Sequence, residues 1–184
     1  MPDFDDVNII RAVKGGDMQA FELVINAFKA PLYQSVYSMI RRHDAADDIS
    51  QEVFIKFFRS IGNFDEKYPI YPWLKKVAFN MTINYLKNVR QKSVSLGDNM
   101  DFAGACRSNT PENNELKTSI RNALDSLEND SRVILTLRLI EELSYKEISE
   151  ILQCPIGSVM SKLFRARMEL KDRLGKAYIE CTES

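Results

Sequence analysis

The sequence predicts an all-α protein made of two small helical domains joined by a flexible linker. Apolar residues recur at spacings of three and four in both halves of the chain, and few stretches show the alternation typical of a strand. One region, residues 93–113, lacks this periodicity and is rich in Gly, Ser, Asn and Asp. We therefore expect helical domains at residues 1–92 and 114–184 of the 184-residue chain, with a linker at 93–113.

The composition is that of an ordinary soluble protein, with 45% hydrophobic and 28% charged residues. No apolar run is long enough to span a membrane, and the first ten residues are acidic, unlike a secretory signal. We expect a cytoplasmic protein with no direct membrane insertion. Cys106, Cys154 and Cys181 are an odd number at wide spacings, which favours reduced thiols over disulfides or a zinc knuckle and leaves open a redox role for Cys106.

Capping residues predict three helices in the first domain. Asp17 is placed to cap a helix that runs to Ala30, and Pro31 to open a second helix. Asp44 is placed to cap a third helix, and Gly62 to end it. The apolar positions expected to face the core from these helices are Phe21, Val24, Ile25, Phe28, Leu32, Val36, Ile40, Ile49, Val53, Phe54, Phe57 and Ile61.

The third helix carries an acidic face. Acids near the start of a helix favour its dipole, which accounts for Asp44 and Asp47. Asp48, Gln51 and Glu52 lie beyond the first turn, at spacings that place them on one side of the helix. The only histidine, His43, adds too little for a metal site, so we expect no metal or cofactor and favour docking to a basic partner.

A fourth helix is predicted from residue 72 to about residue 92, and its charge points to nucleic acid. Residues 75–92 contain five basic residues and no acid, whereas an ordinary solvated helix mixes both signs. Trp73, Leu74, Val77, Ala78 and Met81 are expected to face inward, and Lys76, Asn80, Asn84 and Lys87 to share another face. Phe64, Tyr68 and Tyr71, just before the helix, either stack on unpaired bases or belong to the core.

The second domain ends in a predicted helix-turn-helix. Ser144 and Glu147 form a capping box that starts one helix, and Pro155 is placed to open the next. The expected inward positions, two preceding helices included, are Leu116, Ile120, Leu124, Leu127, Val133, Ile134, Leu137, Ile140, Ile148, Ile151, Leu152, Val159, Leu163, Ala166 and Leu170. The outward positions of the last helix are Ser158, Ser161, Lys162 and Arg165. Residues 155–176 hold six basic and two acidic residues in a near-neutral chain, so this face suits a DNA major groove.

Three segments together resemble an extracytoplasmic-function sigma factor of bacterial RNA polymerase. DAADDISQEVFIKFF at 44–58 is similar to conserved region 2.2, and PWLKKVAFNMTINYLK at 72–87 is similar to regions 2.3 to 2.4. ELSYKEISEILQCPIGSVMSKLFRAR at 142–167 resembles region 4.2. The match covers nearly the whole chain, and residues 93–113 more weakly resemble the region 3.2 linker, with Asp98, Asp101, Glu112 and Glu115 as its acids.

The resemblance implies a function and assigns roles to the candidate residues. It implies a protein that is not an enzyme, binds core RNA polymerase at the β′ clamp helices and the β flap, and directs initiation at promoter DNA under the control of an anti-sigma factor. Asp48, Gln51 and Glu52 match the clamp-docking positions. The expected −10 surface comprises Phe64, Asp65 and Asn80 for a flipped base, Lys75, Lys76 and Lys87 for phosphates, and Asn84. The expected −35 surface comprises Ser158, Ser161, Lys162, Phe164 and Arg165, whereas Met160 stands where many relatives carry a base.

Two other classes of function remain as alternatives. A conventional helix-turn-helix repressor or activator would sense a ligand or dimerise through its first domain, and it would bind its operator tightly without polymerase. A metal-dependent enzyme would use the carboxylates of residues 44–52, and metal analysis would reveal it.

Overall fold

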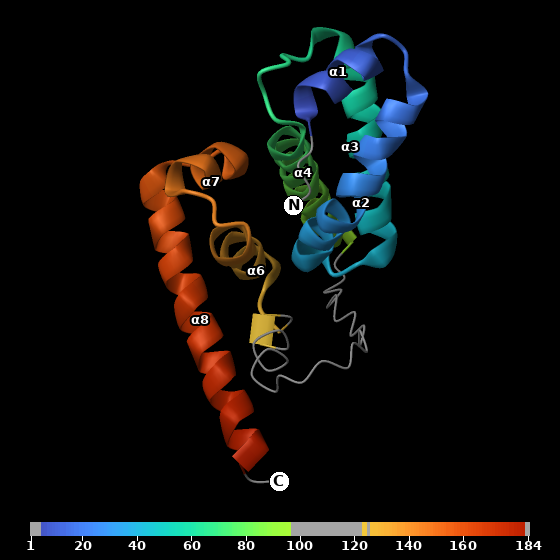
Figure 1. Ribbon diagram of the computed structural model, residues 1–184. Helices are drawn as coiled ribbons and strands as arrows, with labels where there is room; N and C mark the ends of the chain where they lie inside the picture. The colour runs from blue at the N-terminus through green and yellow to red at the C-terminus, as the bar shows by residue number, and fades with distance from the viewer. Residues whose placement is uncertain (1–4, 97–122, 125, 183–184) are drawn as a thin grey trace. The chain divides into compact units, whose positions relative to one another are not determined.

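A computed structural model describes the backbone of residues 5–96, 123–124 and 126–182, and the side chains of residues 5–91, 123–124 and 126–174 (Figure 1). All described elements are helical, which confirms the predicted fold class. The chain divides into two compact units, Met1–Tyr85 and Leu86–Ser184. The linker was expected at residues 93–113, but residues 93–96 continue a helix that begins at Ile70. The rest of it, residues 97–113, lies outside the described residues, as do Glu115, Leu116 and Ile120; the side chain of Cys181 lies outside the described side chains. No described helix combines the length and apolarity needed to cross a bilayer.

The first unit contains α1 (Asp6–Lys14), α2 (Met18–Ile40), α3 (His43–Ser60), a 3₁₀ turn η1 (Ile61–Asn63) and the first part of α4 (Ile70–Leu96). Helix α1 was not predicted from the sequence. Asp5 caps it, because its Oδ1 accepts a hydrogen bond from the Asn8 amide at 3.2 Å. Helices α2 and α3 pack side by side, and α1 packs on α2 (Figure 1).

Helix α2 corrects the prediction of two helices separated at Pro31. It is one helix of 23 residues with Pro31 inside it. Proline removes one backbone hydrogen bond and normally breaks a helix interior. Here Val24, Phe28, Leu32 and Val36 are all buried at spacings of four that continue in phase across Pro31. The apolar face therefore stays on the core through the proline, and its burial outweighs the lost hydrogen bond.

The ends of α3 also differ from the prediction. The helix begins at His43 with Arg42 as its N-cap, and no side chain caps it. Asp44 instead lies in the first turn, where its carboxylate pairs with the Arg42 guanidinium; this bond lowers the pKa of Asp44. The α-helix ends at Ser60, and the 3₁₀ turn η1 follows it directly. Gly62 lies within η1 and is not left-handed, so it does not act as the predicted C-terminal cap.

An aromatic cluster fills the core of the first unit. Phe57 and Phe64 meet edge to face at 5.3 Å between ring centroids, and Trp73 lies within 5.7 Å of both rings. Most predicted core positions of α2 and α3 are buried, but Phe21 and Ile25 are only half-buried. On α4 the buried residues are Ile70, Leu74, Ala78, Phe79, Thr82 and Ile83. The inward face of α4 is thus rotated from the predicted one, and Trp73, Val77 and Met81 lie at its half-buried margin.

The second unit contains α6 (Asn129–Leu135), a π-helical turn η2 (Thr136–Ile140), α7 (Tyr145–Leu152) and α8 (Ile156–Thr182). Helices α6 and α7 both pack against α8 (Figure 1). Val133, Ile134 and Leu137 are buried as predicted, whereas Ile140 is exposed. The π turn explains the error, because the Glu141 amide bonds to the Thr136 carbonyl five residues back at 3.0 Å, and this wider turn shifts the following residues out of helical phase.

The turn between α7 and α8 is set by local signals that confirm the prediction. The Glu147 amide donates to Ser144 Oγ at 3.3 Å, and the Ser144 amide donates to Glu147 Oε2 at 2.8 Å, which completes the capping box. Helix α7 ends at Gln153 in the left-handed conformation, and Pro155 directly precedes α8. Val159, Leu163 and Ala166 are buried against the rest of the unit.

Candidate nucleic-acid interfaces and docking face

The acidic face of α3, formed by Asp48, Gln51 and Glu52, is presented to solvent. Asp48 and Gln51 are exposed, and Glu52 is half-buried with its carboxylate 3.9 Å from the Lys56 ammonium. Ile49 and Val53, on the other side of the same helix, are buried and hold this face outward. The predicted grouping of the three polar residues therefore follows from the helix itself.

An apolar groove of about 390 Å³ lies between α2 and α3, next to the acidic face. Its lining includes Phe21, Ile25, Gln51, Ile55 and Phe58. Ile55 and Phe58 are exposed although they are large and apolar. Their exposure was not predicted, although Ile55 and Phe58 lie four and seven residues beyond Gln51, a spacing that places all three on one side of the helix. The candidate docking surface thus combines carboxylates with exposed apolar side chains.

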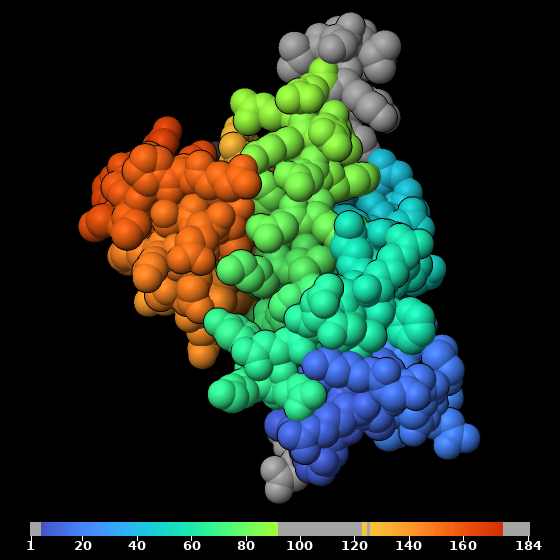
Figure 2. Space-filling view, turned by 90° about the horizontal axis from the view of Figure 1, so that it is seen from above, coloured from blue at the N-terminus to red at the C-terminus, as the bar shows by residue number. Residues whose placement is uncertain are grey.

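Helix α4 exposes the polar face predicted for it. Lys76, Asn80, Asn84 and Lys87 are all exposed, and together we call them the α4 face. Figure 2 shows that α4, in green, presents a continuous strip of its length at the surface. Lys75 lies differently, because its ammonium sits 5.4 Å from the centroid of the Tyr71 ring and 5.9 Å from that of Phe79. The face offers amide donors and acceptors between cations, and it includes no acid.

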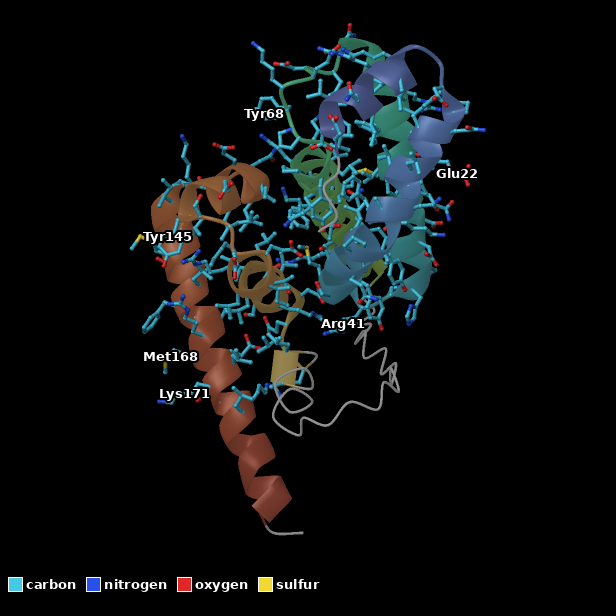
Figure 3. All side chains as sticks on the ribbon, in the orientation of Figure 1. Glu22, Arg41, Tyr68, Tyr145, Met168 and Lys171 are labelled. Carbon is cyan, nitrogen blue, oxygen red and sulfur yellow. The ribbon has the colours of Figure 1, made fainter. Side chains whose placement is uncertain are left out.

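Of the three aromatic residues expected just before the fourth helix, Phe64 and Tyr68 lie in the loop and Tyr71 lies in the first turn of α4; one of the three rings is presented to solvent. Tyr68 extends into solvent with 65% of its surface exposed (Figure 3). Tyr71 stacks on Phe28 at 5.0 Å between centroids. Phe64 is only 7% exposed and belongs to the aromatic core, which contradicts the expectation that its ring is offered to a base. The sequence does not show which of the three rings is exposed, because the burial of a ring depends on residues that are distant in sequence.

Asp65 has a structural role in this loop as well as an exposed side chain. Its Oδ1 accepts a hydrogen bond from the Lys67 amide at 3.0 Å, and its carbonyl accepts one from the Tyr68 amide, also at 3.0 Å. These bonds form a tight turn that turns the chain toward α4. The predicted base-capturing residues Asp65 and Asn80 are both exposed.

The outer surface of α8 carries two neighbouring stripes. Ser161 and Arg165 are exposed and Ser158 and Lys162 half-buried on the predicted polar side. Ser161 Oγ donates to the Gly157 carbonyl at 3.0 Å. An apolar stripe runs beside them at spacings of four, and its members Ile156, Met160, Phe164 and Met168 are all exposed. Figure 3 shows Met168 and Lys171 extending from α8 into solvent. The repeat of four is a signal in the sequence that marks this stripe, although among its members the sequence-based predictions named Met160 and Phe164 alone.

The described residues offer little to a metal ion. Among them, no three His, Cys, Asp or Glu side chains gather where they could hold one. His43 is engaged elsewhere, because its ring stacks on Tyr37 at 4.4 Å and its Nδ1 is hydrogen-bonded to the Tyr33 hydroxyl. Cys154 is a half-buried free thiol.

Comparison with known proteins decides the family. Residues 24–92 match the family model of sigma-70 region 2, and residues 117–170 match that of sigma-70 region 4. The RNA polymerase sigma-H factor of Pseudomonas aeruginosa is 32% identical over 173 residues, which cover 88% of this chain and 90% of that protein. The ECF RNA polymerase sigma-E factor of Escherichia coli is 31% identical over 183 residues, 92% of this chain and 94% of that protein. The chain belongs to the extracytoplasmic-function sigma factors.

Two solved structures share the fold of this sigma factor. The sigma factor RpoE in complex with the anti-sigma factor NepR from Bartonella quintana aligns with a TM-score of 0.61 and 22% identity, over 84% of this chain and 96% of that one. CnrH in complex with the cytosolic domain of CnrY aligns with a TM-score of 0.59 and 19% identity, over 94% of this chain and 99% of that one.

Family membership gives the general activity. As a sigma factor the chain binds core RNA polymerase and directs transcription initiation at promoter DNA. The region 2 match covers the acidic face of α3 and the α4 face, and the region 4 match covers the polar side of α8. Helix α1 precedes residue 24 and lies outside the region 2 match.

Proposed function

We propose that this sigma factor docks on core polymerase through the acidic face of α3 and reads its promoter through two surfaces, the α4 face with its preceding loop and the polar side of α8. One observation carries the proposal: an acidic face and two acid-poor polar faces all reach the surface, with their residues exposed or half-buried, and each lies within a region matched by the sigma family models. The reading domains are residues 1–92 and 114–184, and residues 93–113 tether them.

The first reading surface holds the −10 element as a single strand. Asn80 and Asp65 contact the Watson–Crick edge of an extruded base, since amide and carboxylate groups offer the donors and acceptors that such an edge requires. Tyr68 takes the stacking role that buried Phe64 does not offer. Lys75, Lys76 and Lys87 contact phosphates, and Asn84 extends the same face.

The second reading surface enters the major groove of the −35 element. Arg165 is exposed on α8, and its planar guanidinium suits the two acceptors of guanine. Ser158, Ser161 and Lys162 contact phosphates or base edges beside it. Phe164, a member of the apolar stripe, is 67% exposed, so its ring can pack on a thymine methyl group. This domain also contacts the β flap.

The docking face matches a basic partner such as the β′ clamp helices. Glu52 and Asp48 supply charge, and exposed Ile55 and Phe58 in the adjacent groove supply apolar contact. The formal net charge of the chain is −1, so its electrostatic attraction to free DNA is weak. Sequence-specific binding should therefore arise only in the complex with polymerase.

Control by an anti-sigma factor fits this arrangement. The two similar solved structures are complexes of sigma factors with an anti-sigma factor or with the cytosolic domain of CnrY. A partner that covers the reading surfaces would keep this chain from promoters until it is released. In this account the chain acts by binding, not by catalysis.

The docking assignment is tested by charge reversal. Glu52→Lys places a cation on the acidic face, and Asp172→Lys makes the same change on exposed α8 as a control. Core polymerase should be retained by the immobilised Glu52→Lys chain at least about tenfold more weakly than by wild type, because like charges oppose each other across an interface. The control should bind as wild type, and circular dichroism should show both variants folded. Equal retention of both variants would reject the acidic face as the docking site.

A further inference from the structure

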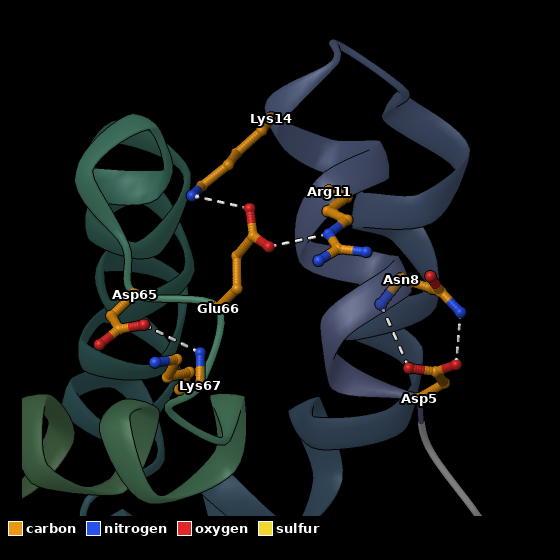
Figure 4. Close-up of polar contacts among 7 residues, drawn as sticks. All are labelled: Asp5, Asn8, Arg11, Lys14, Asp65, Glu66 and Lys67. Carbon is orange, nitrogen blue, oxygen red and sulfur yellow. Dashed lines mark hydrogen bonds and ion pairs between the residues drawn. The ribbon is translucent and has the colours of Figure 1, made fainter.

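Helix α1 contacts the segment that follows η1 at two polar points, the first of which is drawn in Figure 4. The Glu66 carboxylate lies between two cations of α1, with Oε2 at 2.8 Å from Arg11 Nε and Oε1 at 3.4 Å from Lys14 Nζ. Directly after the loop, the amide of Ile70, the first residue of α4, donates to Asp6 Oδ2 at 3.4 Å. Both ends of α1 are thus tied to the segment that carries Asp65 and Tyr68.

The same helix and loop enclose a shallow pocket of about 370 Å³. Val7, Arg11 and Lys14 line it from α1, and residues 64–67 line it from the loop. Phe64, one of the residues that line the pocket, also belongs to the buried aromatic cluster. The loop therefore rests on α1 on one side and on the core through Phe64 on the other.

The ion pairs between α1 and Glu66 restrict where the loop lies on the unit. The bonds of Asp65 to the amides at 67 and 68 are local, so they set the curvature of the turn but not its position on the unit. The Arg11–Glu66 and Lys14–Glu66 pairs join residues 55 and 52 positions apart in the sequence. A long-range tie of this kind restricts the loop as a whole.

The electrostatics identify Glu66 as the stronger of the two ties. Its hydrogen bond from Arg11, together with the one from Lys14, lowers the pKa of the Glu66 carboxyl, so this carboxylate stays charged at neutral pH. Burial raises the pKa of Asp6, whereas the hydrogen bond from the Ile70 amide lowers it. The charged form of Asp6 is therefore stabilised less by its surroundings than the charged form of Glu66. Ion pairs as exposed as those of Glu66 add little to the free energy of folding. Their effect is expected on the loop's conformation.

We propose that α1 is a brace for the loop at residues 64–69 and that Glu66 is a positioning residue for reading the −10 element. This inference rests on the proposed function of the loop and the α4 face. Glu66 does not contact the base. It holds the turn in which Asp65 and Tyr68 are presented, through cations of a helix that lies outside the region 2 match.

Hydrogen exchange in the full chain tests the brace without polymerase or DNA. Glu66→Gln removes the charge with almost no change of shape, and Glu22→Gln does the same at an exposed position of α2. The loop amides at 67, 68 and 70 should exchange about threefold faster in Glu66→Gln, an effect of the size expected for a half-exposed ion pair, and at the wild-type rate in Glu22→Gln. The double variant Arg11→Glu, Glu66→Arg should recover part of the protection. Wild-type exchange in Glu66→Gln would overturn the brace.

Transcription with core polymerase tests the positioning role. Two template sets are needed, one varied only in the −10 element and one only in the −35 element. Glu66→Gln should change the relative transcript yields within the −10 set by about threefold and leave those within the −35 set as in wild type. Unchanged yields within the −10 set, or an equal loss on every template, would contradict a positioning role. If wild type itself gives no transcripts, the proposed function fails, and the exchange experiment still decides on the brace.

Discussion

The two candidate promoter-reading surfaces are held in place by different kinds of contact. The turn that leads into α8 is set by residues close in sequence: the Ser144–Glu147 capping box, left-handed Gln153 and Pro155. The loop before α4 is oriented by residues far apart in sequence, through Arg11, Lys14 and Glu66. The start of the candidate reading helix is thus specified locally, although α6 also packs on that helix, whereas the candidate reading loop depends on tertiary contacts.

This difference predicts where each surface is vulnerable. Changes to the core under α8, or to its turn, should act on stability and on −35 reading. Changes to α1, more than fifty positions before α4, should act on the loop with little loss of stability. Three substitutions, each with a control, and one titration separate these effects.

The largest effect is expected from Leu163→Ala. Leu163 is 2% exposed on the inward side of α8, so truncation leaves a cavity and should lower the free energy of unfolding by about 2–5 kcal/mol. Met160→Ala, on the exposed side one turn earlier, should change it by less than about 0.5 kcal/mol. Urea unfolding followed by circular dichroism measures both. A larger loss for Met160→Ala than for Leu163→Ala would show that the inward and outward sides of α8 are reversed.

Arg165→Ala should weaken promoter recognition by about 1–3 kcal/mol, because it removes a side chain suited to guanine. Arg167→Ala removes an equal charge from a different side of the same exposed helix and serves as the control. Binding of each holoenzyme to promoters with altered −35 elements gives the measurement. If the two variants lose affinity equally on all −35 sequences, Arg165 contributes charge without reading bases.

Ser144→Ala tests how far the α7–α8 turn depends on its cap. The substitution removes the acceptor for the Glu147 amide and should cost about 0.5–2 kcal/mol of stability. Ser161→Ala is a suitable control, since the Ser161 hydroxyl bonds only to the Gly157 carbonyl of its own helix. Thermal unfolding of both variants compares them. A midpoint unchanged by Ser144→Ala would mean that packing alone sets this turn.

The smallest effect concerns the pH dependence of the brace. The pKa of Glu66 lies below its ordinary value of 4.5 in the folded chain, first because of Arg11 and then because of Lys14. A lowered folded-state pKa means that the stabilisation is present above about pH 4.5 and is lost as the pH falls through the folded-state pKa.

A carboxyl NMR titration of the folded chain measures this shift. Arg11→Gln should move the Glu66 midpoint toward 4.5 more than Lys14→Gln does. Asp65 and Lys67 flank Glu66 on the loop and are the same in every variant, so they cancel from the comparison. A midpoint insensitive to Arg11 would remove the electrostatic basis of the brace.

The sequence-based predictions were right where contacts are local and incomplete where contacts are distant in sequence. The capping box, the inward positions Val159 and Leu163, and the exposed α4 face were all predicted, because helical spacing and caps are local signals. The continuous α2 was missed because a proline is a local signal that packing can override. Exposed Ile140 was missed because nothing in the sequence marks a π turn.

The part of the candidate site that was not predicted depends on distant contacts. Burial of Phe64 follows from Phe57 and Trp73 around it, and the exposure of Tyr68 follows from the turn at Asp65. The α1 brace joins residues whose charges alone gave no reason to pair them. Local patterns identified the residue types of the reading surfaces, and the tertiary structure selects which of them face outward.

Transcription by core RNA polymerase on templates with separately randomised −10 and −35 elements tests the two-surface account most directly. Wild type should select sequences in both elements, Asn80→Ala should relax selection only in the −10 element, and Arg165→Ala only in the −35 element. Initiation without selection in either element, or loss of selection in the same element by both variants, would contradict two separate reading surfaces.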